Sequence, residues 1–192
     1  LRGAHVRDAR KWSYYINEAI ELFPEMQVYF GSHHWPLWGN EDVIDFLKKQ
    51  RDGYRYIHDQ PLRLASQGYT PGEIADTLEL PKALRNSFSN RGYYGTLKHN
   101  ARAVYQRYFG WYDGNPANLD PLTIVESSAR YVAAMGGSPG VMAIAQAAFD
   151  DGDYRWVAEL LNHLIFAEPD HADAKMLLAQ SYDQLGYQSE SG

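Results

Sequence analysis

Apolar residues recur at helical spacing through most of the chain, and Gly or Pro interrupts each run. The first run lies between Arg7 and Leu22, and its apolar members are Ala9, Trp12, Ile16, Ala19 and Ile20. Steps of about three and four residues place such side chains on one face of a helix. The chain is therefore predicted to fold mainly as α-helices.

The same spacing predicts further helices over residues 41–67, 70–80, 81–87, 97–109, 141–149, 154–167 and 172–185. Another runs to about residue 135 and begins at either Pro121 or Thr123. Thr70, followed by Glu73 three residues later, predicts a capping box. In the helix over 41–67, Asn40 is the expected cap, Pro61 is expected to introduce a kink and Gly68 to end the helix.

One strand is expected, over Met26–Phe30, because Val28 and Phe30 alternate with polar or smaller residues. The loop that follows, Gly31–Asn40, carries two adjacent histidines. Side chains that follow a strand end are held by the scaffold and remain open to solvent. This loop is therefore a candidate site.

Composition excludes several classes of function. The net charge of −6 disfavours nucleic-acid binding, although residues 69–95 imitate a helix-turn-helix. The absence of Cys rules out disulfides and thiolate metal ligands. No run of 18 apolar residues exists, so no membrane span is predicted and a soluble chain is expected. Because the first residue is not Met, the chain is interpreted as a fragment of a longer protein.

Three separated motifs stand in order: GSHHWPLWGN over 31–40, RGYYGTLKHN over 91–100 and WYDGNPANL over 111–119. Together they resemble the alkylsulfatases of the metallo-β-lactamase superfamily. The resemblance implies that residues 1–40 end a metallo-β-lactamase-like αβ/βα domain and that residues 41–192 form an all-helical dimerisation domain. It also implies a homodimeric parent protein, compatible with a periplasmic or secreted location. That protein would hydrolyse alkyl sulfates such as dodecyl sulfate with two zinc ions.

The resemblance implies that one of the two histidines, His33 or His34, is the family's last zinc ligand. We favour His33, because it is the first residue past the Gly31-Ser32 strand end. By itself a His-His pair is more often structural than metal-binding. The family's HxHxDH zinc motif is absent. One histidine cannot hold two zinc ions, so the chain alone is expected to be inactive.

Two further positions match the family's substrate site. Arg2 matches the sulfate-binding position, and a guanidinium fork suits a tetrahedral oxyanion; the alternative is a terminal Arg without a role. His99 and Tyr94 are candidate general acids for the leaving alcohol. The alternative for this segment is a helix cap at Asn90 with packed tyrosines.

Residues 147–186 resemble one to one and a half tetratricopeptide units, with small residues at Ala147, Ala148 and Ala158 and a turn at Gly152. This favours an embedded helical hairpin. The alternative function is a tetratricopeptide-like scaffold that binds a protein partner without catalysis. The remaining helical histidines, His58, His163 and His171, are interpreted as structural. The sequence leaves open the alkyl chain length, the preference for primary or secondary esters, and the bond that is cleaved.

Overall fold

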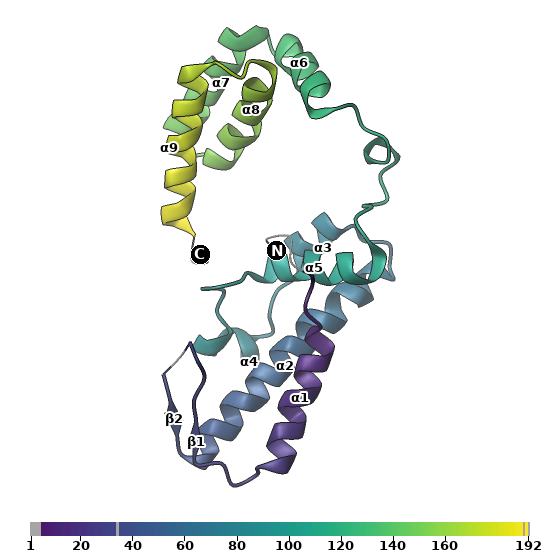
Figure 1. Cartoon of the computed structure of the whole chain (residues 1–192), viewed down its shortest axis with the longest axis vertical. Coiled ribbons are helices and arrows are strands. Elements are labelled where there is room, and N and C mark those ends of the chain that lie inside the picture. Colours follow the sequence, from purple (N-terminus) through teal and green to yellow (C-terminus); the bar gives the residue numbers. More distant parts are fainter. Residues whose placement is uncertain (1–4, 34, 190, 192) are drawn as a thin grey trace. The chain divides into compact units, whose positions relative to one another are not determined.

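The computed structural model describes residues 5–33, 35–189 and 191, and within them the chain is mainly α-helical, as predicted (Figure 1). It divides into two compact units, one reaching to Asn115 and the other beginning at Pro116. Each unit has its own packing and is described separately. The predicted domain boundary at residue 40 stays a prediction.

The first unit is organised around a long helix, α2 (Asn40–Ala65). Helix α1 (Ala9–Leu22) lies along it, as Figure 1 shows. In the sequence between these two helices, strands β1 (Val28–Tyr29) and β2 (Leu37–Trp38) form an antiparallel hairpin. Val28 pairs with Trp38, and Tyr29 pairs with Leu37. Both strands contact α2, so the loop that carries the histidines is attached to this helix.

Shorter elements cover the remainder of α2. They are α3 (Pro71–Thr77), α4 (Lys82–Arg85), the 3₁₀ helix η1 (Phe88–Asn90) and α5 (Leu97–Phe109). Buried Ile74, Leu78 and Ala101 join α3 to α5, and Tyr56 and Leu64 of α2 pack against them. This small core holds the start of α5 in place.

The second unit contains η2 (Pro116–Asn118), α6 (Ile124–Ala134), α7 (Gly137–Asp150), α8 (Tyr154–Ala167) and α9 (Ala172–Gln188). Helix α8 contacts α6, α7 and α9. Its buried face is formed by Val157, Leu160, Leu161 and Leu164. These spacings of three and four are those of a core-facing helix stripe.

The capping box predicted at Thr70 is confirmed, and a second, unpredicted one begins α6. The Thr70 hydroxyl accepts a hydrogen bond from the Glu73 N–H, and the Glu73 carboxylate accepts one from the Thr70 N–H, which completes the capping box. Thr123 and Glu126 repeat the arrangement at α6. Thr123, and not Pro121, is therefore the residue that begins this helix.

The prediction that Asn40 caps α2 is wrong. The N-cap is Gly39 with φ of 94°, and Asn40 is already the first helical residue. The Asn40 amide nitrogen instead donates to the carbonyl oxygens of Pro24 and Met26, at 2.8 and 2.9 Å. It therefore fastens the chain between α1 and β1 to the start of α2.

Other element bounds also differ from the sequence prediction, and α3, for example, ends at Thr77 and not near Leu80. The strand is only Val28–Tyr29, and a second strand, Leu37–Trp38, lies inside the predicted loop. Helix α7 begins at Gly137 and not at Val141, because its Pro139 lies in the first turn, where no N–H is needed. Helix α4 has only four residues. Helix α2 continues through Pro61, and Gly68 follows its end with φ of 91°.

None of the helices in the described ranges is by itself long and apolar enough to cross a membrane. Among the residues that the structure describes, α6 and α7 together are long and apolar enough, but the pair is bent by 81°.

Gly140 and Gly186 are expected to respond in opposite directions to the same substitution. A Cβ at Gly140 would lie 2.2 Å from the Met135 carbonyl oxygen, whereas one at Gly186 would meet no atom within 4 Å. Gly140→Ala should therefore lower the free energy of unfolding of the second unit by about 1–3 kcal/mol. Gly186→Ala should raise it by up to about 0.5–1 kcal/mol, as for an ordinary helical Gly.

The free energy of unfolding is measured in urea, with hydrogen exchange of the α7–α9 amides as the signal. Changes of equal sign for the two variants would contradict the close approach at Gly140.

Candidate functional site

The favoured zinc-ligand candidate, His33, lies in the turn between β1 and β2 and is exposed. His34 and Arg2 lie outside the described residues. The side chains of Trp35 and Trp38 in this loop are 82% and 65% exposed, so packing of these rings within the chain does not orient it. In this chain the loop is held through β1, β2 and the Asn40 hydrogen bonds.

Tyr94 and His99, the proton-donor candidates, lie at the start of α5. The Thr96 hydroxyl oxygen accepts from the His99 N–H at 3.2 Å and lies 2.6 Å from its Nδ1. This capping bond fixes the His99 ring by its Nδ1 side while the residue remains exposed. Tyr94 is 77% exposed. The structure thus brings these two residues to one end of α5, whereas His33 lies on the hairpin.

Asn90 connects the loop that leads to Tyr94 and His99 to α2. Its amide oxygen accepts from Gln50 Nε2 at 2.7 Å, and its amide nitrogen donates to the carbonyl oxygens of Lys49 and Leu84. Gly53, buried on α2, lies beside this amide, and a Cβ added there would be in ordinary van der Waals contact with it, at 3.5 Å. Asn90 is therefore a cross-link between α2, α4 and the loop that leads to Tyr94.

Next to Asn90, aromatic side chains stabilise the loop. The rings of Phe88 and Tyr93 stack with centroids 5.8 Å apart and an angle of 22°. The Arg91 guanidinium lies 5.8 Å from the Phe88 ring centre. The stacked Tyr93 agrees with the alternative prediction of packed tyrosines, but the helix cap which that alternative expected at Asn90 is not observed, because Thr96 caps α5.

A polar network in the first unit escaped the sequence prediction. Buried His58 contacts Asp59 Oδ1 through Nδ1 at 2.6 Å and the Tyr108 hydroxyl through Nε2 at 2.8 Å. Asp59 Oδ2 accepts from Arg55 Nε at 2.6 Å. Burial tends to raise the pKa of Asp59, but the hydrogen bonds from His58 and Arg55 outweigh it, so the pKa lies below its ordinary value. The histidine is structural, as expected, but its partner 50 residues away carried no sequence signal.

Asp8 forms a second network with Arg107 on α5. Asp8 Oδ1 accepts from the Lys11 N–H at 3.0 Å, and Oδ2 accepts from Arg107 Nη2 at 3.1 Å. The Lys11 hydrogen bond, with the nearby charge of Arg107, lowers the pKa of the Asp8 carboxyl. Asp8 thus links the start of α1 to the end of α5.

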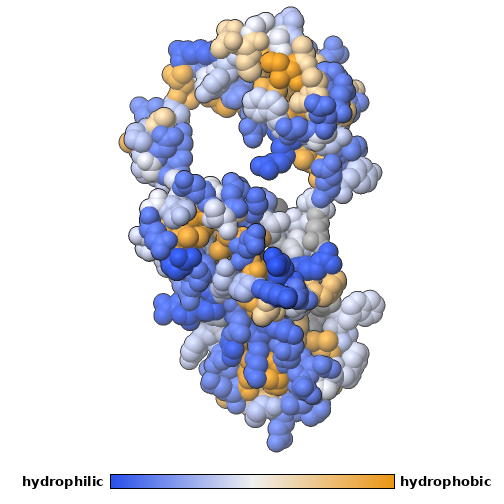
Figure 2. All heavy atoms as spheres, turned by 180° about the vertical axis from the view of Figure 1, so that it is seen from behind, coloured by the Kyte–Doolittle hydropathy of each residue, from blue (hydrophilic) through white to orange (hydrophobic). Residues whose placement is uncertain are grey.

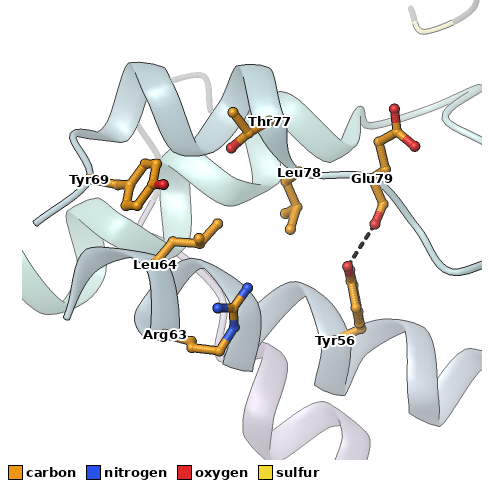
Figure 3. A pocket seen from close by; sticks show the side chains of 7 residues that line it. All are labelled: Tyr56, Arg63, Leu64, Tyr69, Thr77, Leu78 and Glu79. Carbon is orange, nitrogen blue, oxygen red and sulfur yellow. Dashed lines mark hydrogen bonds between the residues drawn. The ribbon is translucent and has the colours of Figure 1, made fainter. Parts of the chain in front are cut away.

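Two open grooves lie in the first unit. One, of about 340 Å³, separates α2 from α3, and in Figure 3 Leu64 and Leu78 face each other across it, with the Tyr56 hydroxyl donating to the Glu79 carbonyl oxygen at 2.7 Å. The other, of about 350 Å³, is mainly aromatic and lies between α1, β1 and α2. Burial raises the pKa of Tyr54, which lines the second groove. Neither groove contains a predicted site residue.

The residues that the structure describes contain no group of three His, Cys, Asp or Glu side chains that could hold a metal ion. His33 is therefore able to contribute at most one ligand to a site that other residues complete. The described part of the chain does not fit a zinc site by itself.

Comparison with known proteins gives consistent similarities. Residues 70–192 match the family model described as alkyl sulfatase dimerisation. Over its whole length the chain is 52% identical to a linear primary-alkylsulfatase of a Pseudomonas species, and it is 50% identical to an alkyl/aryl-sulfatase of Saccharomyces cerevisiae. It spans only 29% and 30% of those two proteins.

Solved structures agree with the sequence similarities. The stereoselective inverting sec-alkylsulfatase Pisa1 from a Pseudomonas species superimposes with a TM-score of 0.95 at 48% identity. The superposition covers 99% of this chain and 30% of that one. The arrangement of the described residues is therefore that of one part of a larger protein.

Replacing Asn90 tests whether it holds the loop that leads to Tyr94 and His99. Asn90→Ala removes the hydrogen bonds that join this residue to Gln50 and to the carbonyl oxygens of Lys49 and Leu84, so it should lower the free energy of unfolding of the first unit by about 1–3 kcal/mol. Hydrogen exchange of residues 91–99 should accelerate. Exposed Asn86, which follows the last residue of α4, is the control, and its replacement by Ala should change stability by less than about 0.5 kcal/mol. Equal effects at the two positions would contradict the role of Asn90.

Proposed function

This chain belongs to the alkyl sulfatase dimerisation family, and we propose that it is the part of an alkyl sulfate ester hydrolase that assembles the dimer and forms one side of the substrate pocket. The single observation that carries the proposal is the match of the entire chain to sulfatases at about half identity. The parent enzyme would convert an alkyl sulfate such as dodecyl sulfate to an alcohol and sulfate. Because the chain spans about 30% of such proteins, it is inactive alone.

In this proposal the chain contributes one imidazole, from His33, to a zinc site of two ions. His34 is the alternative ligand. Neutral imidazole is a favoured zinc ligand, and the exposure of the hairpin turn leaves His33 accessible. The remaining ligands would come from the part of the sulfatase that this chain does not span, since the described residues contain no metal-binding group of three.

The substrate side of the pocket would be formed by Arg2 and the start of α5. Arg2 would bind the sulfate through its guanidinium. His99 or Tyr94 would donate a proton to the departing alkoxide oxygen. Since Thr96 occupies the Nδ1 side of His99, Nε2 is the ring nitrogen left to face a substrate.

The homodimer would use apolar side chains that the chain leaves exposed, which Figure 2 shows as orange patches among hydrophilic residues. Exposed apolar and aromatic side chains within the family match include Leu122, Val125, Tyr131 and Ile144. Large aromatic and aliphatic side chains are typical of permanent interfaces.

A tetratricopeptide-like scaffold without catalysis is not favoured. The similarity to sulfatases extends over the whole chain, including its last helices. The hairpin of α8 and α9 therefore contributes to the dimerisation domain in our proposal.

Purified chain is expected to be a dimer. Light scattering at micromolar concentration should give twice the chain mass of 21.9 kDa. The mass should persist on tenfold dilution, because obligate interfaces bury more than about 2,000 Å². A mass of one chain at micromolar concentration would sink this part of the proposal.

A chimera tests the enzymatic part. This chain replaces the matching stretch of the Pseudomonas linear primary-alkylsulfatase, and sulfate release from dodecyl sulfate is measured together with bound zinc. The chimera should be active and the chain alone inactive. His33→Ala should reduce activity by more than about 100-fold and lower the zinc content, because loss of even an outer partner of a zinc ligand costs about 10–100-fold.

His34→Ala is the matched control, and it should retain both activity and zinc. A loss confined to His34→Ala would transfer the ligand role to that residue. Sulfate release by the chain alone would refute its inactivity.

A further inference from the structure

The segment before α1 is fastened to the last turn of α5 by one side chain. Arg107 Nη1 donates to the Val6 carbonyl oxygen at 2.7 Å, and Nη2 donates to Asp8 Oδ2 at 3.1 Å. The two contacts span 101 and 99 residues of sequence. A guanidinium can make both bonds at once because its donors form a rigid fork.

The contacts are partly shielded from water. The Arg107 and Asp8 side chains are only 27% and 22% exposed. The two oxygens of the Asp8 carboxylate have separate tasks, since Oδ1 caps α1 through the Lys11 N–H while Oδ2 meets the guanidinium. Arg107 therefore fixes both the backbone at Val6 and the first turn of α1.

The end of α5 that provides Arg107 is itself anchored. The neighbouring Tyr108 hydroxyl contacts buried His58 on α2, and Asp59 and Arg55 complete that network. The rings of Tyr105 and Phe109 also pack against each other, with centroids 4.9 Å apart. Arg107 thus projects from a rigid support and not from a frayed helix end.

We propose that Arg107 is a positioning residue for substrate binding, which holds the segment of Val6 and Asp8 against the helix that carries His99. His99 and Arg107 lie eight residues apart on α5, about 12 Å along its axis. Arg2 precedes Val6 by four residues, which span at most about 14 Å. Fixing Val6 thus limits where the Arg2 guanidinium can reach. The inference rests on the proposed function.

The catalytic test uses the chimeric sulfatase described above. Arg107→Ala should raise KM for dodecyl sulfate about tenfold while kcat changes less than about twofold, because sulfate binding and not the chemical step is disturbed. Arg107→Lys should give an intermediate KM, since an ammonium lacks the fork that reaches both acceptors. Arg102→Ala, at an exposed position on α5, is the control and should leave both constants unchanged.

The structural test uses the chain itself. In Arg107→Ala, amide exchange of the Lys11 and Trp12 N–H groups, which are bonded to Asp8, should accelerate about tenfold, because their acceptor residue loses its anchor. Arg102→Ala should leave it unchanged. Unchanged exchange in Arg107→Ala would overturn the anchoring.

Arg2→Ala in the chimera distinguishes a failure of the positioning role of Arg107 from a failure of the proposed function. If Arg2→Ala raises KM and Arg107→Ala does not, the positioning role is overturned while the proposed function stands. If Arg2→Ala leaves KM unchanged, the sulfate assignment fails and the positioning role falls with it. Should Arg107→Ala fail to fold, Arg107→Lys decides, and an unchanged KM in that variant overturns the proposal.

Discussion

Packing against α2 is the constraint on which the first unit depends. Helix α1, both strands of the hairpin, α3, α4, η1 and α5 all contact this helix. With 26 residues it extends about 39 Å, long enough to carry the hairpin with His33 near its start and the His58 network toward its end. Asn90 joins this cover to α2, because its amide bonds both the Gln50 side chain and the Lys49 carbonyl oxygen. The position of the loop that leads from Asn90 to Tyr94 therefore depends on its contacts with α2.

Much of this fold could be predicted because its information is local. Helical spacing locates α1, α5 and α8, and the side chain of Thr70 with Glu73 specifies a helix start without help from the remainder of the chain. Errors occurred where a tertiary contact competed with local chemistry. Asn40 is a residue type that often caps helices, but its side-chain amide bonds the carbonyl oxygens of Pro24 and Met26. Gly39, with a positive φ, is the N-cap instead. The strand Leu37–Trp38 forms only because β1 offers a partner, which a window of sequence does not contain.

The sequence proposes the residues of the candidate site but does not reveal the side chains that support them. His33, Tyr94 and His99 stand within short motifs that resemble a family, so a single sequence sufficed to select them. The side chains that hold those motifs in place, such as Asn90, His58 and Arg107, reach partners between 40 and 101 residues away. No periodicity or spacing records such pairs, and a buried His on an apolar stripe looks the same with or without Tyr108 opposite it.

The double task of Asp8 restricts how this region can change in sequence. An ion pair can ordinarily exchange its charges and keep its attraction. Here an arginine at position 8 would offer only donors, so the Lys11 N–H would lose its acceptor even with an acid at position 107. Asparagine would keep the cap and surrender the charge, and glutamate would move its oxygens one methylene further from the helix start. Few neutral substitutions are therefore open to position 8, because a change at Asp8 cannot be compensated by a single change at Arg107.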